Sequence, residues 1–292
     1  MGDKGLRSND PVQVTVYRPS EDLQSYVTFF YFVKADGMLI DFLYPEWGNV
    51  RFVRNGSWSL SMPGFFPPNS HEGQLYGPTD RTCQIETNGG QIFGFGLTPI
   101  GWHYFFGSGV GEMVNRVVAL GDRLGVSDAE LHGWVINASD ETDLVGRFER
   151  LLMTVGARRP PIKPAMLAVD RALRLRPPTI VEFARSSGLK KRTLQRTCVE
   201  FFGFAPKRLL RLQRFLDSLG QMRSAVGAPI NQAIGLEYHD APHFYHDFRD
   251  FMGMSPRKYL SAPRPLMAEA ARAQTAAGVT LSFKLPPTTN LP

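Results

Sequence analysis

Residues 201–210 read FFGFAPKRLL, and residues 251–260 repeat the pattern as FMGMSPRKYL. Phenylalanine, glycine, proline, two basic residues and a final leucine keep their places in both copies. An echo of this kind indicates one supersecondary unit that the chain uses twice. The residues in front of the first copy show what that unit contains.

The first copy ends a pair of short predicted helices. Thr179 and Glu182 form a capping-box pattern, so a helix should begin near Ile180 and end at about Ser187, before Gly188. A second helix follows, with an apolar and a polar face at helical spacing. Its apolar residues are Leu194, Cys198, Phe201 and Phe202, and its polar residues are Lys191, Arg192, Gln195 and Arg196. Two short helices joined by a tight turn, the second one basic outside, describe a helix-turn-helix.

The helices after this unit are also bounded by glycine and proline residues. Gly203 should end the second helix, and Pro206 should open a connecting helix that runs to about Arg223 and is kept basic by residues such as Arg208. A second pair is predicted at 229–237 and from about Pro242 onward, with Asp240 as the cap and with His243 and His246 on its outer side. A last short helix should run to about residue 260.

Charge is divided unevenly along the chain. Residues 158–264 hold 20 Lys or Arg against 8 Asp or Glu, whereas the remainder holds 13 against 19. A basic outer helix face alone is more often an ordinary solvated surface. A basic segment attached to an acidic one, together with the repeated unit, favours binding to a polyanion such as double-stranded DNA.

The N-terminal half has a different pattern. Short apolar runs rich in Val, Phe, Tyr and Trp, separated by Gly, Pro and Asn, extend from Val12 to Pro99 and predict an antiparallel sandwich or barrel. Short helices are expected at 100–106 and 111–120, and a longer one at 141–155, with Ser139 or Asp140 as its cap.

The aromatic residues of this half have two readings. They are core residues, or some of them line a pocket for a small apolar or aromatic ligand. The candidates for such a pocket are Trp47, Trp58, Phe95 and Trp102.

Catalytic and metal sites are not expected. His71 and Glu72 are adjacent, so on a strand they would face opposite ways and could not ligate one metal together. No nucleophile motif, P-loop or GxGxxG turn occurs in the N-terminal half, and no cofactor is predicted. Cys83 and Cys198 are too few for a disulfide framework and are expected to be buried small hydrophobes.

These patterns predict an α+β, multidomain protein. We expect a β-rich sensor or dimerisation domain at 1–156, a proline-rich linker at 157–164, an all-α domain at 165–262 and a mobile tail at 263–292. The sequence has no apolar run of membrane-spanning length and no signal-peptide pattern, so a cytoplasmic protein is expected.

Residues 165–260 carry a family likeness. The patterns GLxxRTLQR at 188–196 and HFxxDFRxFxGMSPRKYL at 243–260 resemble the DNA-binding domain of AraC-type (AraC/XylS) bacterial transcription regulators. The resemblance implies seven helices, two helix-turn-helix units and one recognition helix per major groove. The N-terminal half more loosely resembles the cupin-like domains that precede such units.

The resemblance also implies which residues contact DNA. In the first unit they are Arg192, Gln195 and Arg196, with Lys191 nearby, and in the second unit the corresponding positions are Ala241, Pro242, His243 and His246. Arg208, on the basic connecting helix, is also expected to contact DNA. The second unit departs from the family pattern, because Glu237 replaces the turn glycine, Pro242 a serine and His246 an arginine. A neutral histidine cannot make the forked contact of an arginine, so the second unit is expected mainly to position the protein.

The expected function is sequence-specific transcription regulation by a homodimer, with RNA polymerase and a small effector as further partners. Two enzyme alternatives stay open at this point. One is an alkyl transferase that uses Cys83, and the other is a metal-dependent cupin, each fused to a DNA-binding domain.

Overall fold

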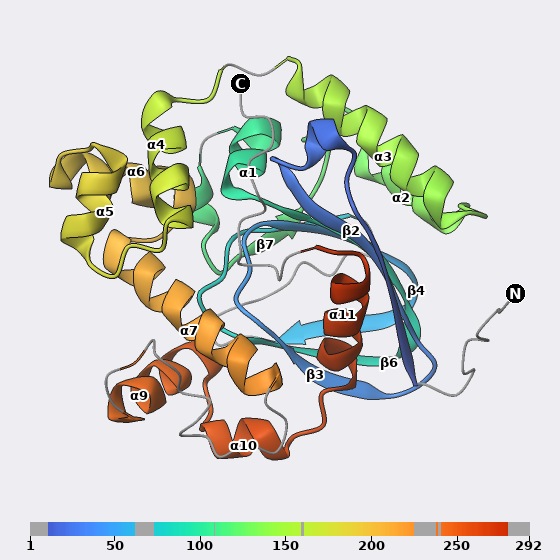
Figure 1. Cartoon of the computed structure of the whole chain (residues 1–292). Coiled ribbons are helices and arrows are strands. Elements are labelled where there is room, and N and C mark those ends of the chain that lie inside the picture. The colour runs from blue at the N-terminus through green and yellow to red at the C-terminus, as the bar shows by residue number, and fades with distance from the viewer. Residues whose placement is uncertain are drawn as a thin grey trace, which may run out of the picture.

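The computed structural model describes residues 11–61, 73–107, 109–158, 161–224, 238 and 241–279. It contains a β-rich N-terminal domain and a helical C-terminal domain (Figure 1), as the sequence predicts. No helix in the described part of the chain is both long and apolar enough to cross a bilayer.

One curved antiparallel sheet forms the N-terminal domain. Its seven described strands are β1 (Val12–Tyr17), β2 (Val27–Ala35), β3 (Leu39–Leu43), β4 (Asn49–Ser61), β5 (Gln74–Tyr76), β6 (Cys83–Leu97) and β7 (Val117–Ala119). The order is β1-β2-β6-β4-β5-β7, and β3 also pairs with β6. β6 is therefore the central strand, because its first part pairs with β3 and its last part with β2 while β4 follows it along most of its length.

Glycines let β4 and β6 bend without ending. Gly56 faces Gly90 across the ladder, where the register shifts, and both have positive φ. A Cβ on Gly90 would lie 2.3 Å from the carbonyl oxygen of Asn55, so the two backbones approach more closely than side chains allow. Glycine-interrupted apolar runs, which the sequence alone suggests are separate strands, are thus continuous in β4 and in β6, and both strands bend at the glycines.

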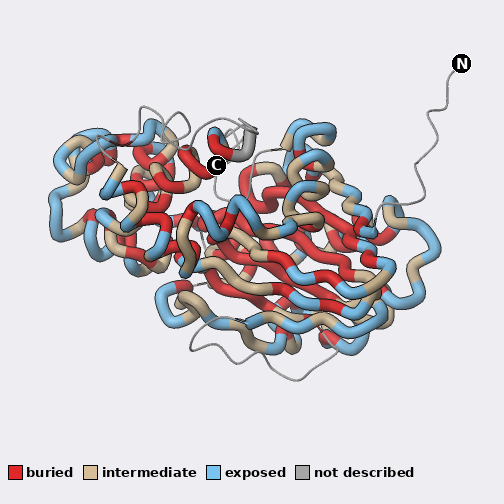
Figure 2. Tube along the Cα trace, turned by 90° about the horizontal axis from the view of Figure 1, so that it is seen from below, coloured by how far each residue is buried: buried red, intermediate tan, exposed pale blue. Residues whose placement is uncertain are grey.

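Different elements pack against the two faces of the sheet. On β2, Phe30 and Phe32 face the helices α1 (Pro99–Phe106), α2 (Asp128–Ile136) and α3 (Glu141–Gly156), where Phe148 is a central contact. The alternate residues Phe29 and Tyr31 face the opposite side. Figure 2 shows the resulting burial, with buried segments running through the strands and exposed ones on the outer helices.

The helical domain contains α4 (Pro164–Arg174), α5 (Ile180–Ser187), α6 (Lys191–Phe202), α7 (Pro206–Ser224), α9 (Ala241–Met252) and α10 (Pro256–Ser261). The turn chemistry matches the prediction: Gly203 and Gly253 are left-handed, and Pro206 and Pro256 are the first residues of the helices that follow. The helix predicted at 229–237 and the cap at Asp240 lie outside the described residues.

Two segments differ from expectation. Residues 111–120 do not form a helix: a 3-10 turn at Val110–Met113 leads into β7, which pairs with β5. Residues 265–276 are not a mobile tail but a helix, α11 (Pro265–Ala276), which packs across the face of β1 and β3 (Figure 1). Both depend on partners distant in the sequence, which periodicity cannot reveal.

The two domains share one apolar core. The cluster that contains Phe95 and Phe148 continues without a break to Phe202, Phe215 and Phe244. Backbone contacts cross the junction as well, since the amide of Thr82 donates to the carbonyl of Phe251 at 2.8 Å. The junction is therefore a packed interface that holds the helical domain against the sheet domain.

Candidate DNA-binding surface and enclosed cavity

The first helix-turn-helix is built by local signals. Thr179 caps α5, its side-chain oxygen accepting from the amide of Glu182 at 3.2 Å. Gly188 then takes φ +66, which allows the tight turn into α6. Phe183 and Leu194 are fully buried and pack the two helices into the core. The turn and the buried faces therefore fix which side of α6 points outward.

The outward side of α6 carries the predicted contact residues. Lys191, Arg192, Gln195 and Arg196 are all exposed, and we call these four the recognition face. Among the described residues, none of its three cations forms a salt bridge. Unpaired guanidinium and ammonium groups remain available to phosphates and guanines.

The second recognition helix, α9, presents a different surface. His243 and His246 are exposed, as expected for outer positions. Nδ1 of His246 lies 3.7 Å from the buried carboxylate of Asp247 on the same helix. Asp250 lies one turn further on, so acidic side chains accompany the histidines on α9.

Three arginines of α7 are paired with these acids and with one from the sheet domain. Three arginines, Arg208, Arg211 and Arg214, face three aspartates, Asp80, Asp247 and Asp250, and we call these six the arginine–aspartate network. Arg211 bonds Asp247 at 2.6 Å and Asp250 at 2.9 Å. Although burial alone would raise it, hydrogen bonds and charge from Arg208 and Arg211 lower the pKa of Asp250.

Arg208 bridges the two domains in this network. Its Nε donates to Asp80 of the sheet domain at 2.6 Å, and its Nη1 donates to Asp250. The guanidinium also lies 4.2 Å from the ring centroid of Phe251. Only 19% of the side chain is exposed, so the structure does not present Arg208 to DNA, contrary to the sequence-based expectation.

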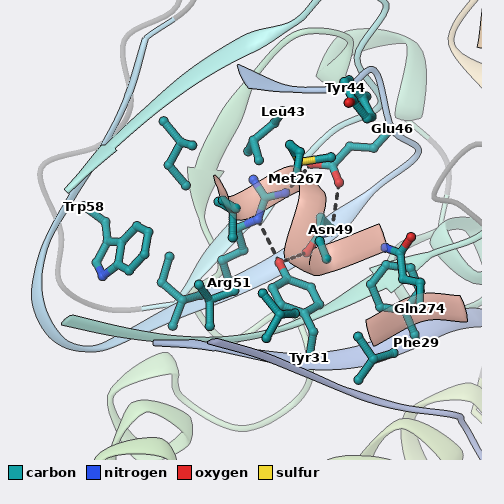
Figure 3. A pocket seen from close by; sticks show the side chains of 17 residues that line it. Phe29, Tyr31, Leu43, Tyr44, Glu46, Asn49, Arg51, Trp58, Met267 and Gln274 are labelled. Carbon is teal, nitrogen blue, oxygen red and sulfur yellow. Dashed lines mark hydrogen bonds and ion pairs between the residues drawn. The ribbon is translucent and has the colours of Figure 1, made fainter. Parts of the chain in front are cut away.

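The cavity lies on the opposite face of the sheet, beneath α11 (Figure 3). Its volume is about 90 Å³. The walls are mostly aliphatic and aromatic, with Phe29 and Ile92 from the sheet and Leu266 from α11. It is the kind of largely apolar cavity in which small molecules bind.

A closed polar network lies in one wall of the cavity. Arg51 donates from Nε to the hydroxyl of Tyr31 at 2.8 Å and pairs with Glu46. The hydroxyl of Tyr31 donates in turn to Asn49 at 2.9 Å, and Asn49 donates to Glu46 at 3.1 Å. The buried arginine is thus neutralised within the protein, which is the usual condition for burying a charge.

Of the four predicted pocket residues, only Trp58 lines this cavity. The ring centroids of Phe95 and Phe148 are 5.8 Å apart on the helix-covered face, and Trp47 packs against Phe202 of α6. Trp102 is likewise part of the core on that face. These three residues lie on the other face of the sheet from this cavity, because residue type alone does not tell which face of a strand a side chain occupies.

The polar residues of the cavity were missed, although the sequence holds a signal for them. Asn49 and Arg51 stand two positions apart in an otherwise apolar run, so they share one face of the strand. A charged residue at an inward strand position indicates a buried polar network and therefore a candidate binding site.

Comparisons with protein families match both halves. Residues 183–262 match a family described as a helix-turn-helix domain, and residues 15–119 match a domain of unknown function, DUF6597. No curated protein matches the chain.

Solved structures give looser likenesses. ToxT from Vibrio cholerae bound to (E)-4-(8-methylnaphthalen-1-yl)but-3-enoic acid is 12% identical over 86% of this chain and 98% of that chain, with a TM-score of 0.44. Another ToxT structure is 13% identical over the same shares, with a TM-score of 0.42. CuxR, described as an AraC-like transcriptional activator, is 14% identical over 77% and 91%, with a TM-score of 0.24.

Superpositions this loose assign no role to any residue of the present chain. The motif match and the repeated helix pairs concern the C-terminal domain, where residues 183–262 form a helix-turn-helix domain of the AraC type. This domain follows a β-rich N-terminal domain, an architecture consistent with a regulator of the AraC type.

Proposed function

We propose that the protein is a sequence-specific transcription regulator that reads two successive major grooves with α6 and α9. The observation that carries the proposal is the contrast between two sets of basic side chains. The cations of the recognition face are exposed and unpaired within the described part of the chain, whereas Arg208, Arg211 and Arg214 of α7 are engaged by aspartates. Charge is therefore left free where a helix can enter a groove.

The two units have unequal roles in this proposal. Arg192 and Arg196 can each contact guanine O6 and N7 with a forked pair of hydrogen bonds, and Gln195 can do the same with adenine. His243 and His246 cannot make such forks while they are neutral. The first unit therefore reads bases, and the second positions the protein on the DNA.

The length of α7 suits this arrangement. Its 19 residues span roughly 28 Å at 1.5 Å per residue, comparable with the spacing of successive major grooves, about 34 Å. The proposal includes a homodimer, contact with RNA polymerase and action in the cytoplasm. Sedimentation of the purified protein tests the first of these.

The N-terminal domain is proposed to take a small effector in the cavity beneath α11. The cavity is largely apolar, and Arg51 beside it is already paired with Glu46 and bonded to Tyr31, so a bound molecule would not have to neutralise Arg51. A molecule with little or no charge fits this chemistry better than a strong anion.

An alkyl-transfer activity at Cys83 is not favoured. Burial raises the pKa of the Cys83 thiol to about 11, so at neutral pH the nucleophilic thiolate is scarce. Burial likewise raises the pKa of Cys198, to about 12.

The test is selection of DNA from a random duplex library by the wild-type protein, followed by fluorescence anisotropy with selected and scrambled duplexes. Arg192→Ala should reduce the preference for the selected duplex roughly 5- to 150-fold, the equivalent of one lost forked contact. Arg147→Ala is the matched control, because Arg147 is an exposed arginine of α3 that pairs with Asp143. Failure of the wild type to enrich any sequence would overturn the proposal.

A further inference from the structure

The last described helix of the chain returns to the first domain. α11 follows the DNA-binding helices, yet it packs on β1 and β3, and Leu266 is 4% exposed in a cluster with Phe29 and Tyr31 (Figure 1). A segment from beyond the DNA-binding domain thus covers part of the cavity of the N-terminal domain.

The start of α11 is held by a buried carboxylate. Asp41 of β3 is fully buried, and its Oδ2 accepts from the amide of Met267 at 2.9 Å. The preceding residue, Arg264, makes no side-chain cap for this helix. A carboxylate at a helix N-terminus satisfies an amide that the helix cannot bond and interacts favourably with the helix dipole. Burying a carboxylate is costly without such bonds, so the hydrogen bond from Met267 to Asp41 fixes the position of α11 on the sheet.

Two residues that line the cavity each have a buried polar atom without a partner among the described residues. Gln274 of α11 is 6% exposed, and its Oε1 is buried without a hydrogen bond. Nε1 of Trp58 is buried without one as well. Both side chains line the cavity, at different places along it (Figure 3). Each unmade bond is costly, and a guest molecule with a donor near Gln274 would restore one of them.

The size of the cavity limits what can enter beneath a seated α11. About 90 Å³ is less than the roughly 150 Å³ of an apolar cavity that admits benzene. The sheet side nevertheless offers flat and branched apolar surfaces, among them Phe29, Trp58 and Ile92, that suit a ring. A ring-sized guest therefore requires α11 to move outward.

We propose that α11 is a ligand-responsive lid: the cavity takes a mostly apolar, single-ring molecule with one hydrogen-bond donor, which bonds Gln274 and displaces α11. The proposal rests on the proposed function, because it assigns the effector site of that regulator. It adds the class of ligand and the element that responds.

Displacement of α11 has a direct route to the second helix-turn-helix. α11 begins four residues after α10 ends, and Tyr259 of α10 is fully buried. Its ring lies 5.5 Å from that of Phe248 on α9, and its hydroxyl bonds that of Tyr44 in the sheet domain. Tyr259 and Phe248 thus connect α10, the helix that precedes the lid in the chain, to the second recognition helix.

The experiment uses the full chain with phenol as the probe and toluene as its partner without a donor. Calorimetric titration should show phenol binding about 3- to 10-fold more tightly than toluene, the value of one hydrogen bond. Hydrogen exchange followed by mass spectrometry should show faster exchange of residues 265–276 at saturating phenol. Gln274→Leu should abolish the preference for phenol.

A filling variant locates the site. Ala270 lines the cavity, so Ala270→Leu should weaken phenol binding at least 10-fold, whereas Ala268→Leu, on an exposed position of the same helix, should bind as the wild type does. Equal binding by both variants, unchanged exchange of α11, or no binding of phenol would each overturn the proposal. DNA selection is measured separately without phenol, so failure of the lid and failure of the regulator are distinguishable.

Discussion

Removal of the Arg208 side chain tests whether this residue stabilises the junction between the domains or contacts DNA. In the structure this guanidinium bonds Asp80 at 2.6 Å, pairs with Asp250 and covers the ring of Phe251. Arg208→Ala leaves two carboxylates, 12% and 28% exposed, without their shared cation. The expected damage is therefore to the junction of the domains and not to the DNA surface.

The magnitude follows from what remains after the change. Breaking a fully buried ion pair by removing one partner costs about 3–5 kcal/mol. Here Asp250 keeps Arg211, and Asp80 keeps the amide of Asn115 at 2.8 Å, so the ionic loss should be about 2 kcal/mol. Loss of the contact with Phe251 adds about 0.5–1 kcal/mol. The free energy of unfolding should fall by about 2–3 kcal/mol.

Two measurements are made on the same proteins. Urea unfolding gives the stability, with Arg147→Ala as the control, because its exposed pair with Asp143 should contribute no more than about 0.5 kcal/mol. DNA affinity is then measured against salt concentration, where each lost phosphate contact lowers the slope by about 0.9. Arg208→Ala should leave the slope unchanged, whereas Lys191→Ala should lower it by about one unit.

The opposite pattern would refute this reasoning. If Arg208→Ala lowered the salt slope by about one unit and left the unfolding free energy within about 0.5 kcal/mol of the wild type, Arg208 would be a phosphate contact after all. The network would then be a resting arrangement that DNA replaces.

Three further changes probe other parts of the fold. Asp41→Ala should weaken the seat of α11 by about 1–2 kcal/mol and speed hydrogen exchange there, and Asp41→Asn, which keeps an acceptor, should do less; equal effects would contradict the capping role. Gly203→Ala should destabilise more than Gly253→Ala in urea unfolding, because both glycines have positive φ but only the Cβ on Gly203 would meet Val114, at 2.6 Å. The pKa of Asp250 is lowered in the folded state, so its stabilising contribution is present above the ordinary value of 3.8 and is lost as the pH falls below it. Wild type should therefore lose stability between about pH 4 and 2 more steeply than Asp250→Asn, and parallel curves would contradict the ion pairing.

The helices of the DNA-binding domain could be predicted because local chemistry decides them. Thr179 accepts the amide of Glu182, Gly188 and Gly203 take left-handed conformations, and Pro206 opens the connecting helix. Each of these signals acts within a few residues of where it stands. The starts of α5 and α7 therefore agree with the structure.

Elements that depend on distant partners could not be predicted in the same way. Residues 117–119 become a strand because β5 offers a pairing edge forty residues away in the sequence. The residues of α11 contain many alanines and polar side chains and look unattached, yet Asp41 supplies the cap and the sheet supplies the apolar surface. Neither the pairing of β7 with β5 nor the packing of α11 on the sheet produces a periodic pattern in the sequence.

The candidate site was predicted in part for the same reason. Periodicity places Arg192 and Arg208 alike on outer helix faces, because it identifies which side of a helix lacks apolar residues. It does not identify what lies opposite that side, and Arg208 meets a carboxylate from the sheet domain, 128 residues earlier in the chain.

The unequal chemistry of the two units follows from this pairing. Asp247 and Asp250 stand on α9, and in binding the arginines of α7 they fix the second recognition helix to the connecting helix. The same acids reduce the positive charge that α9 can offer to phosphates. α6 has only Glu200 as an acidic residue, near its far end, where it bonds Lys163 at 2.8 Å. In the proposed regulator, the first unit therefore keeps its positive charge for DNA, whereas the aspartates of the second unit hold the domain together.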